Sequence, residues 1–362
     1  MARMTHQDHR IQNTGATSPE ALALEDLVSE ADAEELQDLA RRYAISAPRH
    51  LIDLIDKGAE SDPIALQIVP SLQELITTND ERVDPIGDHT HSPLKGLVHR
   101  YPDRVLLKVH SACAMYCRFC FRREMVGPGG DMMTDTDITE ALDYIRKHTE
   151  IWEVILTGGD PMMLSARRIS TFLDALDCIE HVKVVRFHTR LPVAAPERVT
   201  EDLSAALANR RATVYVAVHS NHAREFSEEA LAACQRLTDV GIPLVGQTVL
   251  LKGINDNAEM LADLFRTMVE ARIMPYYLHH PDLAPGTSHF RVSIETGQAL
   301  MKQLRGRISG LAIPTYILDI PGGYGKVPVG PSYISDSEDG ALEIQDINGQ
   351  SHIYQPQKSN AL

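Results

Sequence analysis

The sequence has no long apolar run. Hydrophobic residues make up 43% of its 362 residues and charged residues 23%, as in many globular enzymes. No stretch approaches the roughly 20 apolar residues that a membrane-spanning helix needs. No apolar core follows the polar first residues, 1–10, so a secretory signal is not expected. These absences predict a cytoplasmic protein without a membrane partner, in a compartment where thiols stay reduced.

A surplus of basic residues is also missing. Thirty-five Lys and Arg stand against 50 Asp and Glu, which gives a formal net charge of −15. Nonspecific binding to nucleic acid depends on cations that neutralise phosphates. The charge balance therefore argues against a nucleic-acid partner, although the charge of a pocket can differ from that of the whole surface.

Cysteine is scarce and unevenly distributed. Three of the five cysteines, Cys113, Cys117 and Cys120, lie close together with the spacing C-x3-C-x2-C. Such a loop after an apolar strand can bind three irons of a [4Fe–4S] cluster and leave the fourth iron open for chemistry. A structural zinc site is the alternative, but zinc in such a site takes four ligands. Cys178 and Cys234 lie in helix-like segments and are expected to be ordinary buried thiols.

Most of the chain alternates between apolar, β-branched segments and helical patterns. The expected strands are 105–110, 153–157, 183–188, 213–219, 244–250 and 274–279, and the helices between them include 137–149, 166–177 and 228–240. Six βα units predict a parallel sheet with right-handed crossovers. Since six units are too few for a closed eight-stranded barrel, we expect an α/β fold with a partial (β/α)6 TIM-like barrel. Functional residues of such barrels lie on the loops that follow the strands.

Other segments flank this core. Ser18 followed by Pro19 is typical of a helix start, and the segment 342–354 around Asn348-Gly349 predicts a β-hairpin. A helix over 293–304 and a strand over 313–318 precede a glycine-rich loop, 319–326. The expected division is a disordered N-terminus (1–17), a helical region with a connector (18–96), the barrel (97–310) and a C-terminal segment with the hairpin and tail (311–362).

Two further motifs combine glycine with a functional group. Gly158-Gly159-Asp160 ends the second expected strand, where glycines let the backbone approach a ligand closely and present amide groups to it. Lys326 ends the glycine-rich loop. It is either a solvated lysine on a flexible turn or an amine held to form a Schiff base with an aldehyde cofactor. The loop is not a phosphate-binding P-loop, because its glycine spacing differs and no Ser or Thr follows the lysine.

The ordered set of motifs resembles the lysine 2,3-aminomutases, which combine radical S-adenosylmethionine (SAM) chemistry with pyridoxal 5′-phosphate (PLP). The cysteine loop is the signature of radical SAM enzymes. The similarity extends over about 97–354 and includes RYPDR (100–104), FRR (121–123), LTGGDP (156–161), HTRLP (188–192), GQTVLLKGIND (246–256), PYYLH (275–279), GTSHFR (286–291) and the segment 319–326. The resemblance implies a cytoplasmic isomerase that converts L-lysine to β-lysine.

The resemblance also implies roles for individual residues. These are Cys113, Cys117 and Cys120 for the cluster; Gly158, Gly159, Asp160, His219 and Gln247 for SAM; Lys326, Arg104 and Arg100 for PLP; and Arg122, Asp282 and Asp319 for the substrate. A bidentate guanidinium suits the substrate carboxylate. The two aspartates would bind the ε-ammonium of lysine, which is costly to bury alone, although each could instead shape its own turn. An acidic pair favours lysine over glutamate as the substrate.

Two departures from the family's pattern affect what is expected. No cysteine follows Cys234, whereas clostridial-type enzymes carry a C-terminal cysteine cluster for zinc, so no zinc is predicted and a homo-oligomer is left open. The chain is also shorter at both ends, like bacterial relatives that make β-lysine for elongation factor P. Open alternatives are that role, a glutamate or arginine 2,3-aminomutase, and a non-catalytic iron–sulfur protein. The chemistry would need an electron donor such as flavodoxin or ferredoxin.

Overall fold

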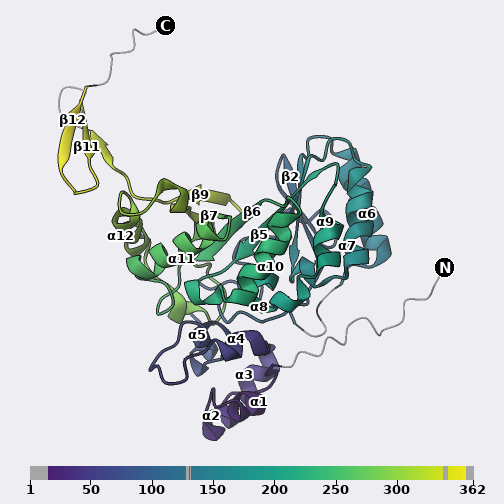
Figure 1. Cartoon of the computed structure of the whole chain (residues 1–362), viewed down its shortest axis with the longest axis horizontal. Helices are drawn as coiled ribbons and strands as arrows, with labels where there is room; N and C mark the ends of the chain where they lie inside the picture. Colours follow the sequence, from purple (N-terminus) through teal and green to yellow (C-terminus); the bar gives the residue numbers. More distant parts are fainter. Residues whose placement is uncertain (1–14, 128–129, 131, 337–340, 356–362) are drawn as a thin grey trace.

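The centre of the protein is a nine-stranded sheet whose strands follow one another in chain order. The computed structural model describes residues 15–127, 130, 132–336 and 341–355. The strands are β1 (Leu97–Tyr101), β2 (Arg104–His110), β3 (Glu153–Gly158), β4 (Val184–Thr189), β5 (Thr213–His219), β6 (Leu244–Val249), β7 (Ile273–His279), β8 (Thr315–Ile320) and β9 (Gly325–Pro328). Strands β2 to β8 are parallel. The predicted partial barrel is confirmed (Figure 1).

The sheet is wider than the six predicted units. β8 joins β7 in parallel, and β1 and β9 add antiparallel edges. The C-terminal segment, 311–362, therefore supplies two strands of the barrel sheet, β8 and β9. Lys326 lies on β9, directly opposite Asp319 of β8, where a loop was expected. The four residues of β9 include a glycine and show too little alternation to predict a strand. They form a strand because β8 supplies the partner for their backbone hydrogen bonds.

Helices cover the outer face of the sheet (Figure 1). They are α6 (Asp135–Lys147), α7 (Ala166–Asp177), α8 (Leu191–Ala194), α9 (Glu201–Leu207), α10 (Glu228–Asp239), α11 (Ala258–Glu270) and α12 (Ile294–Leu304). Four of the longer ones begin at a Ser or Thr N-cap whose hydroxyl accepts a backbone N–H, at Thr134, Ser165, Ser227 and Ser293. Cys234 is buried in α10 as expected. Cys178, however, is exposed, because it follows the last residue of α7 and does not lie on the buried face of that helix.

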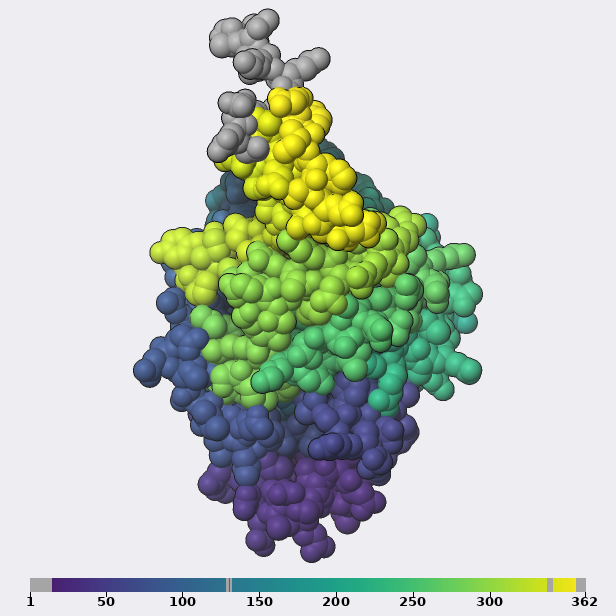
Figure 2. All heavy atoms as spheres, turned by 90° about the vertical axis from the view of Figure 1, so that its left-hand side faces the viewer, coloured from purple at the N-terminus to yellow at the C-terminus, as the bar shows by residue number. Residues whose placement is uncertain are grey.

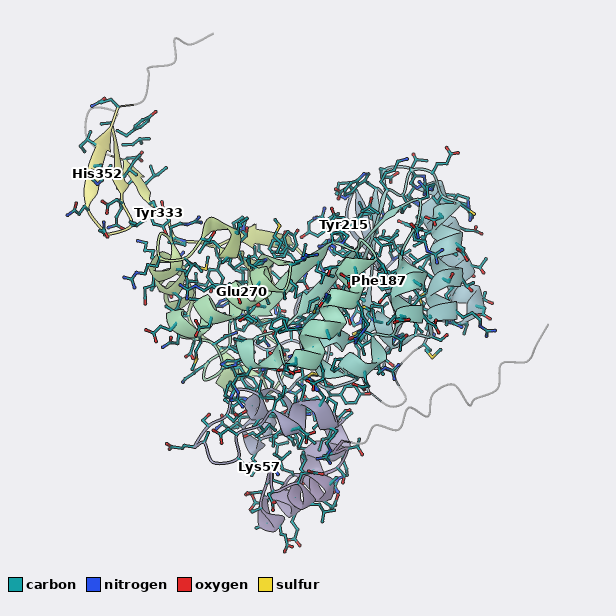
Figure 3. All side chains as sticks on the ribbon, in the orientation of Figure 1. Lys57, Phe187, Tyr215, Glu270, Tyr333 and His352 are labelled. Atoms are coloured by element: carbon teal, nitrogen blue, oxygen red, sulfur yellow. The ribbon has the colours of Figure 1, made fainter. Side chains whose placement is uncertain are left out.

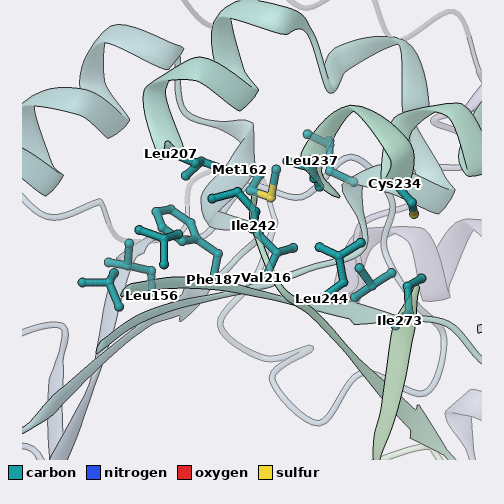
Figure 4. Close-up of a cluster of buried hydrophobic side chains, with 14 of the residues drawn as sticks. Leu156, Met162, Phe187, Leu207, Val216, Cys234, Leu237, Ile242, Leu244 and Ile273 are labelled. Carbon is teal, nitrogen blue, oxygen red and sulfur yellow. The ribbon is translucent and has the colours of Figure 1, made fainter. Parts of the chain in front are cut away.

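Alternation along the strands separates the core from the interior of the barrel. Leu156, Phe187 and Val216 point outward and pack against the helices (Figure 4). Their neighbours Thr157 and His188 point inward and line a cavity. One face of each strand therefore stabilises the fold while the other is available for function.

The N-terminal region packs below the barrel in the view of Figure 1. Its helices are α1 (Pro19–Leu24), α2 (Glu30–Glu35), α3 (Gln37–Arg42), α4 (Arg49–Asp53) and α5 (Ala65–Ile68). Ser18 caps α1 as predicted, and the apolar cluster of this region includes Met115 of the cysteine loop. Ala16 is buried and pairs with Ala47, so the ordered fold begins before residue 18. The rest of the segment expected to be disordered, 1–14, lies outside the described residues.

A second, three-stranded antiparallel sheet follows the barrel. It comprises β10 (Ile334–Asp336), β11 (Leu342–Gln345) and β12 (Ser351–Tyr354). The predicted hairpin is β11–β12, and β10 is an additional strand. The sheet projects from the body of the protein (Figures 1 and 2), and Figure 3 labels His352 on this arm. Among the described residues, no helix combines the length and apolar character needed to cross a membrane.

Candidate active site

The inside of the barrel is a cavity of about 440 Å³, within the size range of small-molecule sites. All the residues that the sequence indicated for a cofactor or substrate line it. They are Arg100, Arg104, Cys113, Cys117, Cys120, Arg122, Gly158, Gly159, Asp160, His219, Gln247, Asp282, Asp319 and Lys326. Parallel strands place the loops that follow them at the same end of the sheet, and this brings the cysteine loop, Gly158, Gly159, Asp160 and Asp282 together. Arg100 and Lys326 come from the antiparallel edge strands β1 and β9, and Arg104 begins β2.

The cysteine loop is supported by a buried carboxylate from the N-terminal connector. Glu74, which is fully buried, accepts hydrogen bonds from Arg118 Nη2 at 2.6 Å and from Arg118 Nε at 2.9 Å. Arg123 also pairs with Glu74. Since both arginines belong to the cysteine loop or its continuation, this pairing fixes the backbone that carries Cys117 and Cys120.

The three free thiols of the cysteine loop line the cavity together, and thiolates are the donors that hold a [4Fe–4S] cluster. In the described part of the chain, no three His, Cys, Asp or Glu side chains lie close enough to hold a single ion. Burial raises the pKa of the Cys113 thiol and raises that of Cys120 to about 11. Metal binding would supply the energy to deprotonate them.

The glycines of Gly158-Gly159-Asp160 pack against the chain that leads into the cysteine loop. Gly158 has a φ of +107°, and a Cβ on Gly159 would lie only 2.3 Å from the carbonyl oxygen of Ala112. Both positions therefore require glycine. The Asp160 carboxylate accepts hydrogen bonds from the Thr189 hydroxyl at 2.7 Å and from the Arg190 N–H at 2.8 Å. These hydrogen bonds hold the end of β4 against the Gly158–Asp160 loop. Burial raises the pKa of the Asp160 carboxyl group.

His219 and Gln247 lie opposite each other at the ends of β5 and β6. Burial and the nearby Arg190 hold the pKa of His219 well below its usual value. The ring is therefore neutral and lies 3.2 Å from Asn221 Oδ1. These two predicted SAM-contact residues therefore line the same part of the cavity.

Two carboxylates face the cavity near Lys326. The Lys326 ammonium forms an ion pair with Asp319 across the β8–β9 ladder. Asp282 forms no ion pair within the described residues. Burial and the charge of Asp319 raise the pKa of Asp282 to about 7. This end of the cavity therefore has more acidic groups than Lys326 alone neutralises.

A buried aspartate that the sequence did not indicate organises the cationic side of the cavity. Asp88 lies 3.0 Å from Arg122 Nη2 and 3.2 Å from Arg100 Nη2, and Lys108 Nζ is 3.6 Å away. Burial opposes ionisation of Asp88, but Arg122 and Lys108 outweigh it and lower its pKa. Asp88 lies in the connector, where no local pattern distinguishes it from a turn residue.

Arg104 and Lys326 lie on either side of Tyr101. The backbone N–H of Lys326 donates to the Tyr101 hydroxyl at 2.8 Å, and the Arg104 guanidinium lies 3.8 Å from the centre of the Tyr101 ring. Tyr101 therefore bridges the two edge strands, β1 and β9. Arg100 is less available to a ligand, because it lies between Asp88 and Asp319.

Comparison with known proteins agrees with this arrangement. Residues 107–265 match the family model of the radical SAM superfamily, and residues 301–357 match that of lysine-2,3-aminomutase. A putative L-lysine 2,3-aminomutase of Aquifex aeolicus is 39% identical over 86% of this chain and 85% of its own length. The L-lysine 2,3-aminomutase of Clostridium subterminale is 38% identical over 90% and 78%, and the glutamate 2,3-aminomutase of Clostridioides difficile 36% over 85% and 72%. The chain therefore belongs to the lysine 2,3-aminomutase family of radical SAM isomerases.

Proposed function

We propose that this protein is a PLP-dependent L-lysine 2,3-aminomutase, which interconverts L-lysine and β-lysine. The observation that carries the proposal is the acidic pair Asp282 and Asp319, which faces the cavity beside Lys326. A substrate ammonium is the chemical group that such a pair binds best, because it relieves the repulsion between the carboxylates. Glutamate would instead bring a third carboxylate to the same place.

The cavity lining contains a group of opposite charge for each end of lysine. Arg122 is held by Asp88 and by the Thr157 hydroxyl, 3.3 Å from its Nη1, and its planar guanidinium suits the substrate α-carboxylate. The acidic pair would bind the ε-ammonium. Fixing both ends orients the carbon atoms between them, and that is the protein's main contribution to such chemistry.

The cofactors would supply the difficult steps. When bound, the [4Fe–4S] cluster and SAM would supply the radical initiator, and PLP would supply the aldehyde that ties the α-amino group and stabilises the radical. Cys113, Cys117 and Cys120 would hold the cluster, and Lys326 would carry PLP with Arg104 beside it. Asp319 pairs with the Lys326 ammonium in this structure, and attachment of PLP to Lys326 would free the Asp319 carboxylate for the substrate ammonium. A one-electron donor such as flavodoxin or ferredoxin would complete the system.

The test is an anaerobic assay of the reconstituted protein with SAM, PLP, dithionite and a panel of lysine, glutamate and arginine. Lysine is the expected substrate, and preference for glutamate would overturn the proposal. Asp319→Asn should raise the KM for lysine far more than that for SAM, because it removes one charge from the ammonium site. An equal rise in both values would show that Asp319 does not bind the ammonium.

A further inference from the structure

Arg190, the residue between β4 and α8, is a buried arginine that reaches the cysteine loop. Arg190 Nη1 donates a hydrogen bond to Cys117 Sγ at 3.2 Å. The side chain of Arg190 is only 8% exposed. A charged donor is therefore aimed at one of the three cysteines inside the protein.

Other buried groups fix the orientation of this guanidinium. Arg190 Nη2 donates to Gln67 Oε1 at 3.0 Å and forms an ion pair with Glu225. Glu225 is fully buried, and its second oxygen accepts the N–H groups of Asn221 at 2.7 Å and His222 at 2.9 Å. Because both carboxylate oxygens are bound, Glu225 holds Arg190 in a single position against the sulfur.

We propose that Arg190 is a positioning residue that hydrogen-bonds the Cys117 thiolate and raises the reduction potential of the cluster, and that Glu225 partly offsets this effect. The inference rests on the proposed function only for the presence of the cluster. It requires neither PLP nor lysine.

The sign of the effect follows from charge. Reduction adds one electron from a low-potential donor to the cluster, taking it from the 2+ to the 1+ state, and breaks no bond in the protein. A positive N–H donor at a ligand sulfur stabilises the more negative state and so raises the potential. The buried anion of Glu225 acts in the opposite direction. Removing Arg190 and neutralising Glu225 should therefore shift the potential in opposite directions.

The experiment is a dithionite titration of the full-length, anaerobically reconstituted protein, followed by the electron paramagnetic resonance signal of the 1+ cluster. SAM, PLP and lysine are left out, and iron and sulfide are counted in every variant. Arg190→Met should make reduction at least tenfold less favourable, which is a 59 mV lower potential for one electron. Arg190→Lys should fall between this variant and the parent protein. Glu225→Gln should raise the potential.

Arg236→Met is the matched control. Arg236 is a half-buried arginine that bonds the carbonyl groups of Val199 and Pro196 and does not line the cavity. Its loss should leave the potential unchanged. A generic loss of packing would make Arg236→Met behave like Arg190→Met and would overturn the inference.

The remaining outcomes are equally decisive. An unchanged potential in Arg190→Met, or a lowered or unchanged one in Glu225→Gln, would overturn the proposal. If Arg190→Met failed to assemble a cluster, a raised potential in Glu225→Gln would still support it. Loss of the cluster in Arg190→Met, Arg190→Lys and Glu225→Gln would overturn the proposal and would show that these residues act in cluster assembly. Failure of the lysine proposal would not affect these measurements, since they contain no substrate.

Discussion

Asp282 provides a sharp test of the substrate site through pH. Its pKa is about 7, against 3.8 for an ordinary aspartate, because it is buried beside Asp319. An ammonium group binds the ionised carboxylate and not the neutral acid. Below pH 7, lysine binding must therefore remove a proton from Asp282, and this requirement weakens the apparent affinity.

The size of the effect follows from the shifted pKa. With one titrating group, the apparent KM is multiplied by 1 + 10^(pKa − pH), which is about 11 at pH 6 and about 1.1 at pH 8 for a pKa of about 7. Lysine binding should thus tighten about tenfold, or by about 1.4 kcal/mol, as the pH rises through this range. Asp282→Asn should bind lysine more weakly and lose this dependence.

The assay compares the KM for lysine with inhibition by norleucine between pH 6 and pH 8. Norleucine lacks the terminal ammonium but has the same α-amino and carboxylate groups, so pH effects on those groups cancel in the ratio of the two constants. In the parent protein, the KM for lysine divided by the inhibition constant of norleucine should fall about tenfold as the pH rises from 6 to 8. A flat ratio in the parent protein, or the same slope in Asp282→Asn, would refute the reasoning.

Three further predictions concern other parts of the cavity. Lys326→Ala should abolish both turnover and PLP attachment while leaving the visible absorption of the cluster intact; retained turnover would exclude the PLP role. Cys117→Ala should prevent assembly of a four-iron cluster, and a normal iron count would contradict its role as a ligand. Asp88→Asn should raise the KM for lysine by about 10- to 100-fold with an unchanged iron content, because a charged hydrogen bond that orients Arg122 is worth about 1.5–3 kcal/mol; an unchanged KM would show that Arg122 does not need Asp88.

Short-range features of the chain were predictable because their cause is local. The cysteine spacing is set within one loop, and the apolar, β-branched segments predicted β2 to β7 to within a residue or two. Features that depend on a distant partner were not predictable. Lys326 is on a strand only because β8 supplies the ladder, and Cys178 is exposed because α7 ends there.

Asp88 and Arg190 show the same limit within the active site. Asp88 lies in a polar connector, and it matters because folding brings it between Arg100 and Arg122. Arg190 belongs to a recognisable motif, but its hydrogen bond to Cys117 spans residues far apart in the chain. Neither contact leaves a periodic or spacing signal in the sequence.

The βα rhythm, the cysteine loop and the candidate residues can all be recognised in the chain before it folds, since they depend on residue type and short spacing. The contacts and charge states of those residues depend on partners that come together when the chain folds. The partial barrel surrounds one cavity, in which Asp282 lies near Asp319 and has a raised pKa, and the fold places Arg190 against Cys117. Burial makes both effects strong, because charges interact over short distances with little screening by water.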